Sequence, residues 1–235
     1  MCVVSLYAKH IQVLEIIRRY SRLSHASKKP RVVIDVDDVL LELNPHVAEQ
    51  VRQKGYPDFR VENILTYDLN KSLDKSCLPR HQRHLMDNGL GCPRDLILSL
   101  YRDPNIFKTV PITCGFYKGL KLLTEKFEVI INSNNFSLDI MEEKLNLFKH
   151  SCQDLDLQYN FCISSDKPLF NNVYAVFEDS IGNLKIYPDG CIKLLVNRPQ
   201  NQELYNGELL IGIKNLYRVD SFYAGVKKLI EELSY

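Results

Sequence analysis

The stretch RVVIDVDDVL, residues 31–40, decides how the rest of the chain is interpreted. Its first half is a β-branched run, which is typical of a strand buried in a parallel sheet. Three carboxylates, Asp35, Asp37 and Asp38, stand where that strand should finish. Carboxylates crowded at the end of a buried strand repel one another and lose solvation. A bound Mg²⁺ would offset that cost, because this hard cation is satisfied by carboxylate oxygen and water.

Length, composition and charge limit the class of protein. A chain of 235 residues fits one large domain or one domain carrying a smaller insertion. With 30 basic and 29 acidic residues the net charge is +1, so we expect a small-molecule partner rather than nucleic acid or a membrane. No apolar run is long enough to span a bilayer and the first residues are too charged for a signal peptide, so a cytoplasmic location is expected.

Cysteine usage excludes two further classes. The seven cysteines are scattered and form no CxxC pair. This spacing argues against a disulfide framework and against a structural zinc site.

Hydrophobic spacing predicts strands that alternate with helices. This alternation implies right-handed crossovers and a mostly parallel α/β sheet covered on both faces. A polar, irregular segment at 45–107 interrupts the pattern and is interpreted as an insertion of short helices. The predicted helices are 5–22, 114–127, 137–151 and 221–235, and the predicted strands are 31–36, 128–133, 159–164, 172–180 and 191–197.

Polar side chains follow several of these strands. In open α/β sheets, ligands bind beyond the carboxyl ends of the strands, where the loops converge. Three carboxylates, a hydroxyl and an ammonium at one edge are what phosphoryl transfer needs: a nucleophile, a proton carrier, a cation ligand and two groups that bind phosphate oxygens. The residues expected at this edge include these groups with a fourth acid to spare: Asp35, Asp37, Glu178 and Asp179, together with Ser133 and Lys167.

In this order, the motifs resemble the haloacid dehalogenase (HAD) superfamily of aspartate-dependent phosphatases over nearly everything after residue 30. Within it the chain is most similar to the 5'(3')-deoxyribonucleotidases, through TYDLNKSL, the segment DPNIFKTVPITCGFYKGLKLLTEKFEVIINS and LLVNRPQNQ. The resemblance implies a Rossmann-like doubly wound parallel sheet. It divides the chain into an N-terminal helix and linker at 1–28, a catalytic core at 29–44 and 108–235, and a helical cap at 45–107.

The resemblance also implies a chemical role for each motif. Asp35 is the nucleophile that forms an aspartyl-phosphate, and Asp37 protonates the leaving oxygen and then activates water. Ser133 and the amide of Asn134 bind the phosphate, and Lys167 offsets charge between the phosphate and Asp35.

The implied cofactor is Mg²⁺. Its ligands are the Asp35 carboxylate, the backbone carbonyl of Asp37 and one acid of the Glu178 and Asp179 pair, with Asp179 preferred. In the cap, three aromatic rings are candidates to stack on a base, although such rings more often fill a small core. They are Phe59, Tyr67 and Phe107.

The sequence departs from this pattern in three places. Asp38 stands where the nucleotidases usually have glycine, Glu178 replaces the first acid of a frequent Asp-Asp pair, and asparagines surround Ser133. A bland interpretation also exists for Asp35 and Asp37, because aspartate favours strand-end turns and helix caps.

The predicted function is that of a 5'-nucleotidase-type phosphoric monoester hydrolase, which releases phosphate from (deoxy)nucleoside monophosphates in nucleotide metabolism. The alternatives are a HAD phosphatase for a sugar phosphate or a nucleic-acid 3'-phosphate, and a catalytically weak nucleotide-binding protein on the same fold. A receiver-type signalling domain also clusters acids, but it has no room for the segment 45–107. The expected partner is a small-molecule nucleotide, with no membrane and no nucleic acid, and a homodimer is left open.

Overall fold

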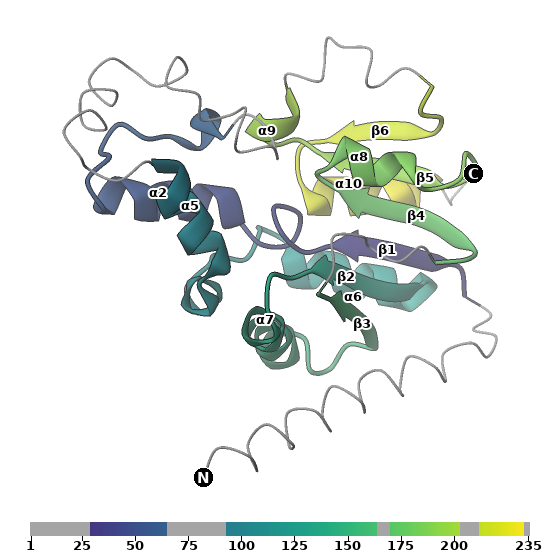
Figure 1. Cartoon of the computed structure of the whole chain (residues 1–235). Coiled ribbons are helices and arrows are strands. Elements are labelled where there is room, and N and C mark those ends of the chain that lie inside the picture. Colours follow the sequence, from purple (N-terminus) through teal and green to yellow (C-terminus); the bar gives the residue numbers. More distant parts are fainter. Residues whose placement is uncertain (1–28, 65–92, 164–169, 203–211, 233–235) are drawn as a thin grey trace.

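The computed structural model describes residues 29–64, 93–163, 170–202 and 212–232. Within them, six strands form one all-parallel sheet in the order β3-β2-β1-β4-β5-β6, which confirms the predicted α/β class (Figure 1). The strands are β1 (Arg31–Asp35), β2 (Glu128–Asn134), β3 (Leu157–Cys162), β4 (Val173–Glu178), β5 (Ile192–Val196) and β6 (Leu216–Val219).

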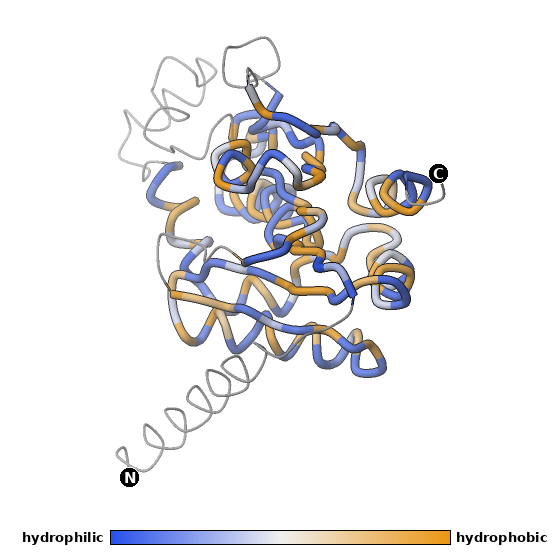
Figure 2. The backbone as a smooth tube through the Cα atoms, turned by 90° about the vertical axis from the view of Figure 1, so that its right-hand side faces the viewer, coloured by the Kyte–Doolittle hydropathy of each residue, from blue (hydrophilic) through white to orange (hydrophobic). Residues whose placement is uncertain are grey.

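Helices occupy the connections between the strands. They are α2 (Leu43–Gln53), α5 (Pro93–Arg102), α6 (Phe116–Lys126), α7 (Leu138–Ser151), α8 (Ile181–Lys185), α9 (Pro199–Gln202) and α10 (Phe222–Glu232), with the 3-10 turns η2 (Val61–Asn63) and η4 (Pro104–Lys108). Figure 2 shows hydrophobic and hydrophilic residues alternating along these helices, as amphipathic packing against a sheet requires.

Alternation along the strands sends side chains to two separate cores. In β1, Val32 and Ile34 join a large cluster that α6, α7 and α10 cover. Val33 between them joins a smaller cluster on the opposite face, beneath α8. The sheet is therefore covered on both faces, because successive side chains of a strand point in opposite directions.

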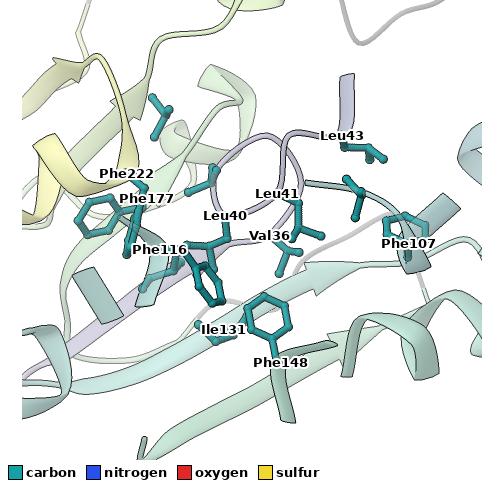
Figure 3. Close-up of a cluster of buried hydrophobic side chains, with 14 of the residues drawn as sticks. Val36, Leu40, Leu41, Leu43, Phe107, Phe116, Ile131, Phe148, Phe177 and Phe222 are labelled. Carbon is teal, nitrogen blue, oxygen red and sulfur yellow. The ribbon is translucent and has the colours of Figure 1, made fainter. Parts of the chain in front are cut away.

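The large core continues beyond the sheet into the segment that follows β1. Val36, Leu40 and Leu41 are fully buried, and Figure 3 shows them between the rings over the sheet and Phe107 of η4. Phe116 and Phe148 pack with ring centroids 5.6 Å apart, which joins α6 to α7. This apolar continuity fixes the loop after β1 against the body of the molecule.

The described part of the segment between β1 and α6 contains helices α2 and α5 and the turns η2 and η4. Helices α2 and α5 lie beyond the carboxyl ends of the strands (Figure 1). Helix α2 begins at Leu43, two residues before the predicted boundary at 45. The N-terminal helix predicted at 5–22 lies outside the described residues.

Candidate functional site

Three buried carboxylates meet at the carboxyl ends of β1 and β4. Asp35 ends β1 and Glu178 ends β4, and the register that pairs Ile34 with Phe177 places the two acids at the same level. Asp179 follows directly. One carboxylate oxygen of each residue lies within 4.8 Å of the others. Oxygen donors this close can share one divalent cation, so the cluster is compatible with Mg²⁺.

The loop after β1 is a tight turn. The carbonyl of Val36 accepts hydrogen bonds from the backbone N–H groups of Leu40 and Leu41, at 2.9 and 3.0 Å. Asp38 inside the turn has φ of 58°. This left-handed conformation favours glycine and admits Asp and Asn more readily than other residues. The turn therefore calls for glycine or a short polar residue, and Asp38 meets that requirement.

Asp38 is buried and hydrogen-bonded on both oxygens. Its Oδ1 accepts from the backbone N–H of Asn44 at 2.9 Å and its Oδ2 from Gln200 Nε2 at 3.2 Å. Burial raises the pKa of Asp38 to about 7, against the lowering effects of the Asn44 N–H and the Arg198 guanidinium. Asn44 is in the first turn of α2, so Asp38 caps the N-terminus of this helix. Glu42, the residue at the N-cap position, makes no side-chain capping bond.

The hydroxyl of Ser133 lies on β2, beside the acids. Asn132 pairs with Asp35 in the sheet, so Ser133 stands one residue further along the neighbouring strand. Asn134 ends β2, and its Oδ1 accepts from Cys162 Sγ at 3.1 Å. The structure thus places the predicted phosphate-binding pair at the same edge as the predicted nucleophile.

A lysine that the sequence analysis did not single out completes this edge. Lys144 of α7 donates from Nζ to Asp37 Oδ2 at 2.6 Å and to Ser133 Oγ at 3.0 Å. Its side chain is 1% exposed. Lys144 therefore links the second aspartate of the DxD motif to the hydroxyl of the neighbouring strand.

The segment after β5 supports the acids from the other side. Gln200 Nε2 donates to Asp179 Oδ2 at 3.1 Å as well as to Asp38, and Asn201 Nδ2 donates to the Asp179 carbonyl at 2.8 Å. Arg198 Nε donates to the Asp38 carbonyl at 2.6 Å, and its two terminal nitrogens pair with Glu42. These contacts orient Asp179 and attach the turn after β1 to the turn after β5.

The inserted segment reaches the site through Tyr101 of α5. The Tyr101 hydroxyl donates to Asn44 Oδ1. Burial and the negative charges of Asp38, Asp37 and Asp179 raise the pKa of Tyr101 well above its ordinary value. Tyr101 is therefore a neutral hydrogen-bond donor near the acids.

Two of the aromatic residues expected to stack on a base do not face the site. Phe59 is completely buried, and Phe107 is buried in the core that Figure 3 shows. Neither ring has a free face for a base, so this expectation was wrong for both, and their role is to pack the insertion. Tyr67 and Lys167 lie outside the described residues.

The missed residues left signals in the sequence. Lys144 lies on the apolar stripe of α7, together with Ile140, Met141 and Phe148. A lysine is rarely buried at such a position unless its charge is paired. The polar run NRPQNQ directly after the buried strand β5 carries Arg198, Gln200 and Asn201 to the carboxyl edge. The acids were found by looking for polar residues directly after a buried strand. The same search after β5 would have found Arg198, Gln200 and Asn201.

Comparison with solved structures identifies the fold. A protein from Haemophilus somnus described as a predicted phosphoglycolate phosphatase has a TM-score of 0.54 at 11% identity, covering 86% of this chain and 99% of that one. A protein from Bacillus subtilis assigned to the HAD-hydrolases and bound to magnesium has a TM-score of 0.53 at 12% identity, covering 88% and 99%. One from Thermotoga maritima assigned as a beta-phosphoglucomutase has a TM-score of 0.51 at 14% identity, covering 87% and 99%.

The chain therefore has the fold of the haloacid dehalogenase-like hydrolases. No protein-family model matches the sequence, and no curated protein resembles it at a significant level. None of the three structures is described as a nucleotidase. In the described part of the chain, no helix has both the length and the apolar character needed to cross a membrane.

Proposed function

We propose that this protein is a magnesium-dependent phosphomonoesterase that works through an aspartyl-phosphate. The observation that supports this most directly is the convergence of Asp35, Glu178 and Asp179 within 4.8 Å, on the fold of the HAD-like hydrolases. On such sheets, a ligand site forms where the strands end. Asp37 and Ser133, linked by Lys144, adjoin the cluster.

The residues present fit a magnesium ion. Asp35, Glu178 and Asp179 offer carboxylate oxygens, which are the ligands that Mg²⁺ prefers, and the Asp37 carbonyl is a further donor by resemblance. Amide groups orient two of the acids: Asn183 Nδ2 lies 3.2 Å from both Glu178 carboxylate oxygens, and Gln200 binds Asp179. When bound, the cation neutralises charge on the acids and on the phosphate oxygens.

The proposed reaction has two displacement steps at phosphorus, both carried out by Asp35 and Asp37. In the first, an Asp35 oxygen bonds to phosphorus while the bond to the leaving oxygen breaks, and Asp37 gives that oxygen a proton. In the second, Asp37 takes a proton from water, and the water oxygen displaces Asp35 to release inorganic phosphate. Ser133 and the Asn134 amide bind the phosphate oxygens, and Lys167 is proposed to bind them as well.

For the substrate we propose a (deoxy)nucleoside monophosphate. The support comes from the nucleotidase-like segments of the sequence and from one exposed ring beside the site. Phe136, three residues after Ser133, is 61% exposed, and the Arg102 guanidinium of α5 lies 5.9 Å from its ring centroid. An exposed ring and a planar cation at this position suit the flat base of a nucleoside.

The test is phosphate release from 5'- and 3'-(deoxy)nucleoside monophosphates, a sugar phosphate and a 3'-phosphorylated oligonucleotide, each with Mg²⁺ and with EDTA. Release that needs Mg²⁺ from one or a few nucleotides would support both parts of the proposal. Release from the sugar phosphate or the oligonucleotide alone would keep the chemistry and replace the substrate. Nucleotide binding without turnover would favour a binding protein on this fold.

Phe136→Ala separates base recognition from chemistry. We expect this variant to lose activity on the preferred nucleotide while keeping activity on glycerol phosphate, because only the first substrate has a flat ring to stack. Equal losses on both substrates would argue against stacking at Phe136.

A further inference from the structure

We infer that Lys144 is a positioning residue for the phosphate end of this site, holding the Ser133 hydroxyl and the Asp37 carboxylate in place from α7. The inference rests on the proposed function. It adds a lysine that lies on the helix after β2, apart from Lys167. Its partner Asp37 lies in the turn after β1 and its partner Ser133 lies on β2, so one side chain joins two motifs.

The burial of Lys144 calls for an explanation beyond stability. The side chain is 1% exposed, between apolar neighbours on the same face of α7. Taking an ammonium out of water is costly, and an apolar residue in place of a buried ion pair is often neutral or stabilising. A lysine at this position is therefore better explained by what its charge does for Asp37 and Ser133.

The contact with Ser133 determines how that hydroxyl can act. An ammonium group only donates, so Ser133 Oγ must be the acceptor in the 3.0 Å contact. The hydroxyl proton stays available for donation, and its contact with the Asn134 carbonyl is long, at 3.4 Å. Lys144 thus presents Ser133 as a donor, which is what binding a phosphate oxygen requires.

The ammonium is held from a third side. The ring of Phe107 from η4 lies 4.7 Å from Lys144 Nζ, at cation–π distance. Contacts from the turn after β1, from β2 and from the inserted segment leave the group little freedom. The buried Phe107 ring therefore contributes to the site indirectly, because it fixes the cation instead of stacking on a base.

The experiment compares Lys144→Met with Lys149→Met, a matched control on the exposed face of the same helix. For each we would measure turnover of para-nitrophenyl phosphate with Mg²⁺, inhibition by inorganic phosphate and thermal unfolding. We expect Lys144→Met to lower kcat on the order of 10²-fold, the typical effect of losing one preorganised donor, and to weaken phosphate binding about tenfold. Lys149→Met is expected to change neither.

A double-mutant cycle with Ser133→Ala distinguishes positioning from packing. If Lys144 acts through Ser133, its replacement costs much less phosphate affinity once Ser133 is alanine, so the two effects do not add. Full additivity, or a Lys144→Met variant equal to Lys149→Met, would overturn the inference. Should Lys144→Met fail to fold, Lys144→Gln keeps a hydrogen-bond donor without the charge and enters the same cycle.

The phosphate-binding measurement also separates this inference from the proposed function. A wild-type chain that binds inorganic phosphate but hydrolyses no phosphomonoester would refute the proposed function, and the cycle on phosphate affinity would still decide the role of Lys144. A wild-type chain that neither binds phosphate nor hydrolyses any substrate would overturn both.

Discussion

At the scale of single residues, Asp38 shows how one side chain serves the backbone and the site together. Its φ of 58° makes the turn after β1, and its Oδ1 caps α2. Through Gln200 it is also tied to Asp179. Asp38 is therefore part of the framework of the acidic cluster.

Substitutions at Asp38 are expected to separate according to backbone preference. Asn tolerates the left-handed region, and its side-chain oxygen can still accept the Asn44 N–H that caps α2. We expect Asp38→Asn to keep the unfolding free energy, and Asp38→Val to lose at least the roughly 1–2 kcal/mol that a left-handed residue costs. Urea unfolding measures both, and equal stability of the two variants would contradict the role of the turn.

Asp35→Asn tests the nucleophile. An amide in place of the carboxylate cannot attack phosphorus, so we expect turnover to vanish while the circular dichroism spectrum and the unfolding midpoint stay close to wild type. Asp37→Asn is the comparison, with an expected loss on the order of 10²–10⁴-fold from general acid and base catalysis. Activity near wild type in Asp35→Asn would mean that another residue attacks.

The sequence was sufficient to locate the acids and the Ser133 hydroxyl, because each stands at or directly after the carboxyl end of a strand that its apolar residues reveal. It was not sufficient for Lys144, which reaches the site from the middle of a helix. Helical periodicity shows which residues share a face, but not which strand that face meets. Phe59 and Phe107 show the converse: an aromatic residue in a polar segment indicates a local core as readily as a binding surface.

At the scale of elements, the long periodic segments were predicted well and the short ones were missed. The predicted helix 137–151 is α7, and the predicted strand 128–133 is β2. Strand β6 and helix α9 have four residues each, and both were missed. Four residues carry too little periodicity to distinguish a strand or a helix from a loop.

Close packing between α6 and α10 gives a prediction at this scale. A Cβ atom added to Gly119 would lie 2.6 Å from Cε1 of the buried Phe222 ring, so Gly119→Ala forces the two helices apart. We expect a loss of roughly 1–3 kcal/mol, the usual cost of overpacking. Gly182→Ala in α8 is the control, because its Cβ meets only Ser180 Oγ at 3.6 Å. Thermal unfolding measures the stability of both variants. If Gly119→Ala is as stable as wild type, Phe222 can move aside without cost and the prediction is wrong.

At the scale of the whole molecule, the metal and the fold are expected to be linked. Asp35, Glu178 and Asp179 come from distant parts of the sequence and meet only in the folded sheet. A ligand that binds only the folded state stabilises it, by about 2.7 kcal/mol at a concentration one hundred times the dissociation constant. We therefore expect Mg²⁺ to raise the unfolding temperature of the wild-type chain.

Asp179→Asn is the matched variant for this measurement. It keeps the size of the side chain, so it is expected to fold, but it loses a charged ligand and with it most of the Mg²⁺ effect. A Mg²⁺ shift that survives in Asp179→Asn would place the ion elsewhere, and no shift in the wild-type chain would argue against a metal at the cluster.

The placement of the insertion between β1 and its neighbour β2 has a consequence for how such a protein can change over time. The entropy of closing a flexible connection grows slowly with its length, by about 0.6 kcal/mol for each doubling. A change in the length of the chain inserted between β1 and β2 therefore costs little against the pairing of β1 with β2, which rests on contacts between the two strands themselves. The acids stay in register when the inserted chain changes, so the surface near them can diverge between related proteins while the acidic cluster is kept.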